Sequence, residues 1–293
     1  MYVARMANEC GLDKWTSVSQ VDHAVSKKIT GPYEFHDVAI GVWSHNPAPI
    51  TLPDGTFAIF HIGNGLHDGN VTDCSNGNDR VLFSEPSSSL SSSGSTVHTS
   101  SSLYGPWEPL ENNTLPGCNN PAPFVHSNGT IYIVCQEKLY RTESIYNNWT
   151  FVSNVSHPNG PSAIYEDPYL YVDHRGHFHL LYHAYQTFTA QTCVNSTVSA
   201  HAYSEDGFVW YSNPEQPYST QVQMAGGSTV TVSTRERPKL FFDKNGYPTH
   251  LFNGVCSATS CPPPLGPKTG CVDCKAAGYW DYTLVSELVT SSN

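Results

Sequence analysis

A short pattern that occurs four times in the chain most restricts what it can fold into. In each copy a proline is followed eight residues later by a glycine, with aromatic or β-branched residues on either side. Such residues favour strands and glycine favours tight turns, so each copy predicts a β-hairpin. The prolines and their glycines are Pro47 and Gly55, Pro121 and Gly129, Pro168 and Gly176, and Pro238 and Gly246.

Other features repeat in step with the hairpins. The segment 23–26 (HAVS) precedes 31–34 (GPYE), and 98–101 (HTSS) precedes 105–108 (GPWE). Residues 23–57 and 98–131 are therefore two copies of one repeated template. A third version of its outer part lies at 201–210. Repeated short strands joined by Gly and Pro turns, without helical periodicity, predict an all-β fold, a five-bladed β-propeller.

The recurrent proline places the expected site. Proline cannot donate to a β-ladder, so it belongs on an edge strand or at a strand's start, and the innermost strand of a propeller blade is such an edge. The residues just before each proline are therefore expected at the mouth of the central channel. They are His45 and Asn46, Asn119 and Asn120, Glu166 and Asp167, and Glu236 and Arg237.

The repeats divide the chain into blades of one predicted domain, residues 1–293. The blades are expected at about 1–43, 44–110, 119–158, 164–211 and 235–293, with 212–234 as a polar connection and 84–95 as an inserted loop. The first blade, with strands predicted over 2–7, 15–26 and 33–43, lacks its innermost strand. We expect that strand upstream of Met1, or lost, which would leave the edge at 2–7 open.

Composition limits the partners and the compartment. Charged residues make up 13% and aromatic residues 12%, a profile typical of an extracellular β protein. The net charge of −11 argues against nucleic acid, and no run of about 18 apolar residues predicts a membrane span. We expect a secreted monomer, although the first residues do not resemble a signal peptide. The glycosylation sequons begin at Asn70, Asn112, Asn128, Asn148, Asn154 and Asn195.

Nine cysteines agree with an oxidising compartment. Four of them crowd into 256–274, where Cys271 and Cys274 form a CxxC motif. This motif alone permits a zinc or redox site, but a loop closed by disulfides is the preferred interpretation. The odd number leaves at least one thiol free or paired outside the chain.

Three segments carry a resemblance to a known family. They are 166–185 (EDPYLYVDHRGHFHLLYHAY), 201–210 (HAYSEDGFVW) and 235–255 (RERPKLFFDKNGYPTHLFNGV). They resemble the family-43 glycoside hydrolases, five-bladed propellers of the arabinanase, xylosidase and levansucrase type. The resemblance implies a carbohydrate substrate of plant or algal type and hydrolysis with inversion. It also implies an Asp base from the first blade, an orienting Asp from the third and a Glu acid from the fourth.

The family's catalytic residues fit this chain in two ways. Counted by blade, the first Asp has no counterpart, the second falls on Asn120 and the Glu falls on Glu166. Counted by spacing, the trio is Asn46, Asp167 and Glu236. The candidate catalytic residues are therefore Glu166, Asp167 and Glu236, with Asp22 as a further place to look for the base. The candidate substrate-binding residues are His45, Asn46, Asn120, His183, Arg235 and Arg237.

Several alternatives stay open. Strand alternation sends Glu166 and Asp167 to opposite faces, so one of them would point into the channel. Glu236, between two arginines, is expected to be ionised or part of an ion-pair cluster. The histidines at 177, 179 and 183 are expected to be hydrogen-bonded packing residues rather than metal ligands, and no cofactor is expected, although related propellers sometimes hold a channel cation. The alternative function is an inactive propeller that binds carbohydrate or protein.

Overall fold

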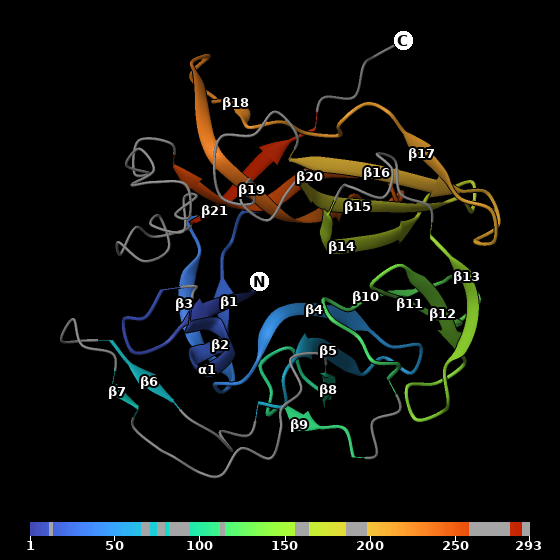
Figure 1. The fold of residues 1–293 in the computed structure, drawn as a ribbon, viewed down its shortest axis with the longest axis horizontal. Helices are drawn as coiled ribbons and strands as arrows, with labels where there is room; N and C mark the ends of the chain where they lie inside the picture. Colours follow the sequence, from blue (N-terminus) through green and yellow to red (C-terminus); the bar gives the residue numbers. More distant parts are fainter. Residues whose placement is uncertain are drawn as a thin grey trace. The chain divides into compact units, whose positions relative to one another are not determined.

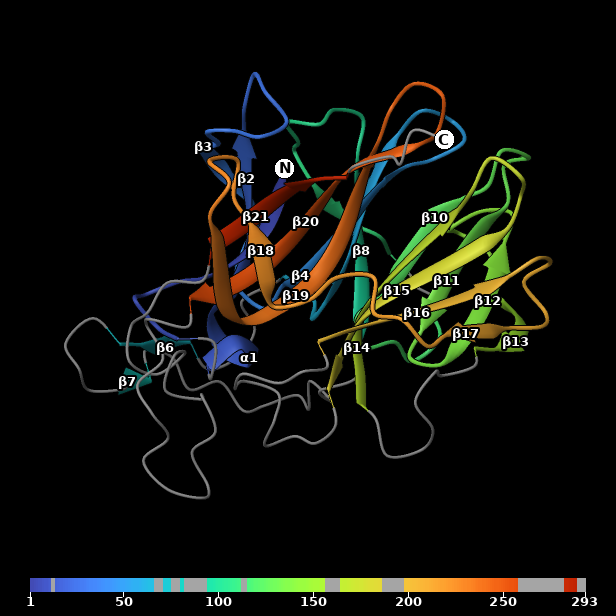
Figure 2. The ribbon, with the colours of Figure 1, turned by 90° about the horizontal axis from the view of Figure 1, so that it is seen from above.

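The chain is almost entirely β, which confirms the predicted fold class. The computed structural model describes residues 1–11, 14–65, 71–74, 80–81, 94–111, 115–155, 164–185, 198–257 and 282–288. Within these ranges lie five antiparallel sheets of three or four strands, one two-stranded ribbon and one short helix, the arrangement of a five-bladed β-propeller (Figures 1 and 2). None of the helical residues described forms a stretch long and apolar enough to cross a membrane.

The chain has two compact units, residues 1–152 and 153–293. The first contains three sheets, in strand orders β1-β2-β3, β4-β5-β8-β9 and β10-β11-β12-β13, the last strand reaching the boundary. Their strands are β1 (Tyr2–Met6), β2 (Ser19–Val25), β3 (Glu34–Ile40), β4 (His45–Thr51), β5 (Phe57–Ile62), β8 (Ser95–Ser100), β9 (Glu108–Pro109), β10 (Ala122–Val125), β11 (Ile131–Cys135), β12 (Lys138–Thr142) and β13 (Thr150–Asn154). The ribbon is β6 (Thr72–Asp73) with β7 (Arg80–Val81).

The second unit contains two sheets, in orders β14-β15-β16-β17 and β18-β19-β20-β21. Their strands are β14 (Ile164–Val172), β15 (Phe178–Tyr185), β16 (Ser199–Ser204), β17 (Tyr211–Asn213), β18 (Gln221–Gln223), β19 (Thr229–Phe242), β20 (Pro248–Ser257) and β21 (Tyr282–Glu287). That the whole chain acts as one domain stays a prediction.

The four predicted hairpins are confirmed as β4–β5, β10–β11, β14–β15 and β19–β20. Each turns at the predicted glycine, whose φ lies between 81° and 89°. Side chains disfavour this left-handed region, which explains why glycine recurs there. The first sheet has three strands in the part of the chain described, with β1 at one edge, as the sequence predicts.

Two predicted element boundaries were wrong. Residues 15–18 form one helical turn, α1 (Trp15–Val18), rather than the start of a strand. That turn buries Val18 in an apolar cluster with Ala7 and Val42, a burial that alternating periodicity does not reveal. The segment 212–234 is not only a connection, because β18 pairs with the first part of β19 across a turn at Gly227 (φ 83°). Of the predicted 84–95 insertion, 84–93 lie outside the described residues.

Two disulfides join described cysteines, Cys10 to Cys74 and Cys118 to Cys135. The second lies in the apolar cluster between the second and third sheets, with Phe60 and Ile133. The predicted disulfide-closed loop around Cys271 and Cys274 lies outside the described residues. Three of the predicted glycosylation sites, Asn128, Asn148 and Asn154, are exposed.

We expect acid to destabilise the chain through a buried histidine pair. His61 Nε2 lies 2.9 Å from His98 Nδ1. Burial lowers the pKa of His61 to about 3 and that of His98 to about 4. Unfolded histidine titrates near pH 6.5, so between about pH 6.5 and 4 the unfolded chain binds more protons than the folded chain. The free energy of unfolding should therefore fall with pH across this window, by at most about 1.4 kcal/mol per pH unit and group.

Urea unfolding at pH 7 and pH 5 tests this expectation. In a His98→Gln variant the loss of stability between the two pH values should be smaller than in the unsubstituted protein. His174→Gln, at an exposed position, is the control and should keep the full loss. An equal loss in both variants would show that the buried pair is not responsible.

Candidate active site

The residue before each recurrent proline has an unusual backbone conformation. Asn46, Asn120, Asp167 and Arg237 have φ between 50° and 55°, in the left-handed region. Asn and Asp are the side chains that tolerate this region best, whereas Arg237 is an exception.

A bulge accompanies this conformation in three of the hairpins. The pairing with the neighbouring strand shifts between His45 and Ala48, between Glu166 and Tyr169, and between Glu236 and Lys239. The left-handed residue and its proline together stand opposite a single residue of the partner strand. Proline fits there because an unpaired bulge position needs no N–H donor, and bulges re-aim side chains near active sites.

The bulge in β14 brings Glu166 and Asp167 together. One ligand atom from each of Glu166, Asp167 and His183 can be chosen so that all three lie within 4.8 Å of one another. His183 Nδ1 lies 3.9 Å from Asp167 Oδ2, and both side chains are buried. The prediction that strand alternation separates Glu166 from Asp167 was wrong, because alternation does not pass through a left-handed residue. This set is near enough to hold a cation or to share a proton.

The equivalent position in β19 holds Glu236 in an ion pair. Arg237 Nη1 donates to Glu236 Oε2 at 2.7 Å, and Glu236 is 5% exposed. Arg235 is engaged elsewhere in the same sheet. Its guanidinium donates to Asn253 Oδ1 (2.9 Å), to the Ser219 carbonyl (3.1 Å) and to Ser286 Oγ (3.0 Å). The predicted ion-pair cluster therefore consists of Glu236 and Arg237, whereas Arg235 links β19 by hydrogen bonds to the neighbouring strands.

Two residues that the sequence analysis did not select also belong to this region. Tyr218 is buried, and its hydroxyl donates to the Tyr182 carbonyl at 3.2 Å. Burial raises the pKa of Tyr218, Arg235 opposes that rise, and Asp167 and Glu236 add to it. Both carboxylates therefore act on one phenol within this unit.

Lys239 is the second residue that was missed. Loss of hydration lowers the pKa of Lys239 to about 8, and the charge of Asp167 opposes this decrease. Its Nζ lies 5.3 Å from the centre of the Tyr169 ring. The signal was present in the sequence, because the residue after the recurrent proline is Ala48, Ala122 and Tyr169 in the other copies. Only the last copy has a charge there.

In the first unit the corresponding positions form an amide pair. Asn46 Nδ2 donates to Asn120 Oδ1 at 2.6 Å, so the two predicted substrate-binding asparagines are brought together. His45 has other contacts. Its Nδ1 is 2.7 Å from Ser19 Oγ and its ring stacks on Trp15 at 4.8 Å. Asp22, the further candidate for the base, is buried and accepts from Gln20 Nε2 at 2.6 Å and from Arg5 Nε.

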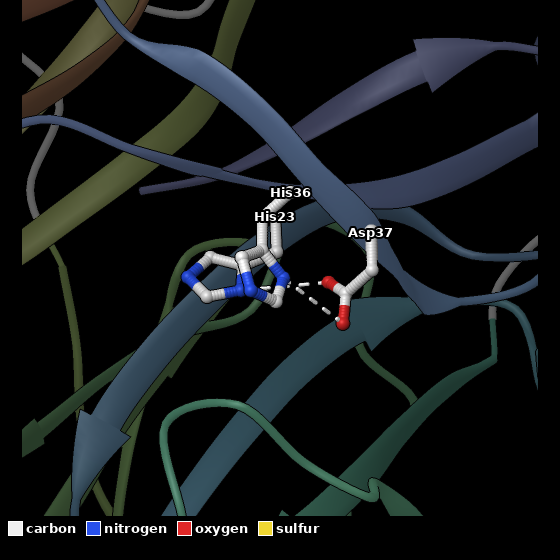
Figure 3. Close-up of side chains that lie close together, drawn as sticks. All are labelled: His23, His36 and Asp37. Carbon is white, nitrogen blue, oxygen red and sulfur yellow. Dashed lines mark ion pairs between the residues drawn. The ribbon is translucent and has the colours of Figure 1, made fainter.

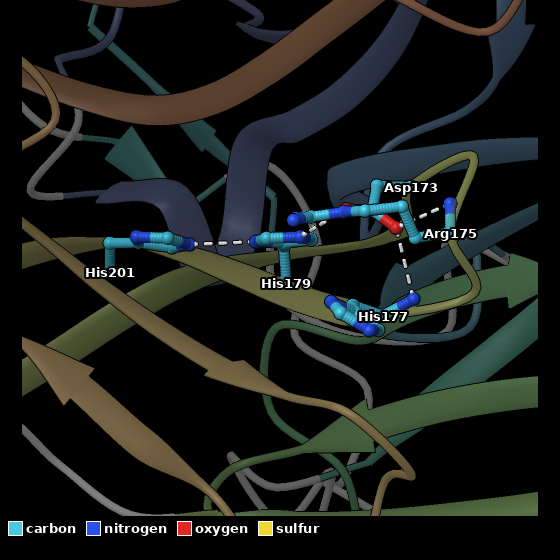
Figure 4. Close-up of polar contacts among 5 residues, drawn as sticks. All are labelled: Asp173, Arg175, His177, His179 and His201. Atoms are coloured by element: carbon cyan, nitrogen blue, oxygen red, sulfur yellow. Dashed lines mark hydrogen bonds and ion pairs between the residues drawn. The ribbon is translucent and has the colours of Figure 1, made fainter.

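His179, one of the other predicted histidines, lies in a hydrogen-bonded row in the fourth sheet (Figure 4). His179 Nε2 lies 3.2 Å from Asp173 Oδ2, and His179 Nδ1 lies 3.0 Å from His201 Nε2. The backbone N–H of His177 donates to Asp173 Oδ1 at 3.0 Å, and Arg175 Nη2 donates to Asp173 Oδ2 at 2.6 Å. Asp173 organises the turn between β14 and β15, and its pKa is lowered by these hydrogen bonds although burial opposes them.

Comparison with solved structures confirms the resemblance at the level of fold. An endo-1,4-beta-xylanase from Bacteroides thetaiotaomicron superposes with a TM-score of 0.56 at 14% identity, covering 99% of this chain and 94% of the xylanase. An endo-arabinase from the same organism gives 0.53 at 12% identity, covering 93% and 87%. A xylan beta-1,4-xylosidase from Bacillus halodurans gives 0.56 at 14%, covering 98% of this chain but 50% of that one.

Another superposed structure is described as a thermostable family-43 glycoside hydrolase, with a TM-score of 0.55 at 12% identity and coverage of 93% and 83%. No protein-family model matches the chain. No curated protein matches it in sequence. The chain therefore has the propeller fold of family-43 glycoside hydrolases.

The left-handed conformation of Asp167 is open to a stability test. Asp167→Asn and Asp167→Ala both remove the charge, but alanine tolerates this conformation less well than asparagine. We expect Asp167→Ala to be less stable than Asp167→Asn by about 1–2 kcal/mol in urea unfolding.

The same comparison at Asn154, an exposed residue of β13, is the control. Asn154→Asp and Asn154→Ala should differ by no more than about 0.5 kcal/mol. If the two Asp167 variants were equally stable, the backbone at this position would not be under the constraint described.

Proposed function

We propose that this protein is a glycoside hydrolase that acts on a plant- or algal-type glycan through carboxylates of its second unit. The observation that carries the proposal is the bulge at Asp167, which places Glu166, Asp167 and His183 within 4.8 Å of one another. Support comes from the fold, because the superposed structures are described as a xylanase, an arabinase and a xylosidase.

Glu166 is the proposed general acid. Its side chain is half-buried, whereas Asp167 is 6% exposed. A second carboxylate so close opposes the loss of the proton from Glu166, and a protonated carboxyl is what the leaving sugar oxygen requires. Asp167 is too close to Glu166 to act as the base of an inverting pair, because that geometry needs about 6.5–9.5 Å between the carboxyl groups. Its proposed role is to keep the acid protonated.

Glu236 is the proposed second carboxylate. The ion pair with Arg237 at 2.7 Å favours its ionised form, which can attract a proton from water. Arg237 lies beside Glu236, and His183 lies beside Glu166 and Asp167, where each can donate hydrogen bonds to sugar hydroxyls. Arg235 is proposed to support this arrangement through Asn253, whose Nδ2 donates to the Glu236 carbonyl at 3.1 Å.

The acid role of Glu166 predicts a dependence on the leaving group. Glu166→Gln should lower kcat/KM by about 10²–10⁴-fold on xylan, arabinan or 4-nitrophenyl glycosides. With 2,4-dinitrophenyl glycosides the loss should be much smaller, because this leaving group needs no protonation. Glu236→Gln should lose activity on both kinds of substrate, and Glu205→Gln, at an exposed position of the same unit, on neither. Full activity of both Glu166→Gln and Glu236→Gln would refute the assignment.

A cation bound by Glu166, Asp167 and His183 would stabilise the ionised carboxylate of Glu166, which could then not donate a proton. We therefore propose hydrolysis without a cofactor and expect EDTA-treated protein to keep its full rate. A rate that falls on treatment and returns with added Ca²⁺ would assign the three residues to a metal site instead. If the three residues do hold a metal, Asp167→Asn should abolish the restoring effect of Ca²⁺, because it removes a ligand of the cation and keeps Glu166.

One observation favours a second candidate function, a carbohydrate-binding propeller without activity. The first unit presents Asn46 and Asn120 as an amide pair where the resemblance implies a carboxylate. Amides hydrogen-bond sugar hydroxyls but cannot exchange protons near neutral pH. Calorimetric binding of an oligosaccharide without release of reducing sugar, weakened by Asn120→Ala, would support this function over hydrolysis.

A further inference from the structure

A second cluster of metal-ligating side chains lies in the first sheet and has no part in the proposed hydrolysis. His23 is on β2, and His36 and Asp37 are on β3 (Figure 3). The pairing passes from His23 opposite Asp37 to Ala24 opposite Phe35, so His36 is the extra residue of a bulge. The bulge lets two successive side chains of β3 approach the same histidine, which a regular strand would not allow.

Two distances in this cluster, each measured to a different oxygen of Asp37, are close to those between neighbouring ligands of one metal ion. His23 Nδ1 lies 3.4 Å from Asp37 Oδ1, and His36 Nδ1 lies 3.3 Å from Asp37 Oδ2. Three ligand atoms, one from each residue, lie within 4.8 Å of one another. Zinc binds His nitrogen and carboxylate oxygen at about 2.0–2.2 Å in a tetrahedron, which sets neighbouring ligand atoms about 3.3–3.5 Å apart.

Burial gives the cluster a second indication of a ligand. His23 is 5% exposed. Among the residues that the structure describes, its Nδ1 and the facing Oδ1 of Asp37 are both buried and have no hydrogen-bond partner. Buried polar atoms are nearly always satisfied, and an ion between these two atoms would satisfy both.

Aromatic rings fix the position of the two imidazoles. The ring of His23 stacks on Tyr2 at 4.8 Å, and Tyr104 lies 5.3 Å from His23 and 5.1 Å from His36. The hydroxyl of Tyr2 is itself held by the Leu103 carbonyl. Ligands held in place before binding lose little freedom when the ion arrives.

The repeated template shows that the fold itself does not require this set. His23 corresponds to His98 in the second copy, but counting from the shared Gly-Pro gives Leu110 in place of His36. His98 is hydrogen-bonded to His61 instead. The histidine of β3 therefore does not recur in the second copy.

We propose that His23, His36 and Asp37 bind one divalent transition-metal ion of the zinc class, with solvent completing the coordination. Two imidazoles and one carboxylate suit zinc and its neighbours, whereas Ca²⁺ and Mg²⁺ prefer oxygen ligands alone. The site shares no residue with the carboxylates proposed for hydrolysis.

Zinc titration of the full chain after EDTA treatment tests the proposal. Calorimetry should show one more equivalent of Zn²⁺ bound to the unsubstituted protein than to His36→Ala, or an affinity at least about 10-fold higher. Co²⁺ used as a probe should give visible absorption bands of a tetrahedral site, and these should be lost in His36→Ala. His174→Ala, at another exposed histidine, is the matched control and should retain both signals.

The test compares each variant with the unsubstituted protein. Other zinc-binding groups are present in all of these proteins and therefore do not affect the difference. His36 is exposed, and circular dichroism should show that His36→Ala keeps its fold. The near-isosteric Asp37→Asn variant should also lose the tight equivalent and provides a second measurement. Equal stoichiometry and affinity in the unsubstituted protein and in either folded variant would overturn the proposal.

Discussion

The left-handed residue before each recurrent proline is the constraint on which the candidate site depends. A strand with regular pairing turns successive side chains to opposite faces. At Asp167 the φ of 52° breaks that alternation, and Asp167 and Glu166 come to the same region. Proline then holds the bulge in place, since it fixes its own φ and needs no partner for a backbone N–H. Backbone geometry, rather than the strand's pattern of side chains, therefore decides which carboxylates meet.

The sequence allowed the fold and most of its register to be predicted because both rest on local rules. Glycines at 55, 129, 176 and 246 mark turns that only glycine adopts readily, and the residues around them favour strands. The pairing of Glu166 with Asp167 could not be predicted in the same way. A residue before proline is normally extended, so the rule that applied to the rest of the strand gave the wrong face here. Tyr218 was also missed, since it belongs to no repeat and reaches the carboxylates only through tertiary packing.

The histidine of the outer template shows how one position acquires different chemistry in successive sheets. His98 pairs with His61 at the bulge of the second sheet, and His201 continues a row from Asp173 through His179 in the fourth. His23 instead faces Asp37 and His36. Strand pairing fixes where the imidazole lies, while the neighbouring strands determine whether it meets an imidazole, a carboxylate or both. Position in the repeat alone therefore does not predict a histidine's role.

At the residues before the recurrent prolines, too, the backbone conformation does not determine the chemistry of the side chain. Asparagine and aspartate tolerate the left-handed conformation for the same reason, a short polar side chain that bonds locally. Asn46, Asn120 and Asp167 thus satisfy one backbone requirement, yet only Asp167 carries a charge. An exchange between Asn and Asp at these positions is compatible with the left-handed backbone, and it adds or removes a titratable group. The propeller is therefore compatible with hydrolysis and with binding, and the ionisable pair at Glu166 and Asp167 is the feature that favours hydrolysis.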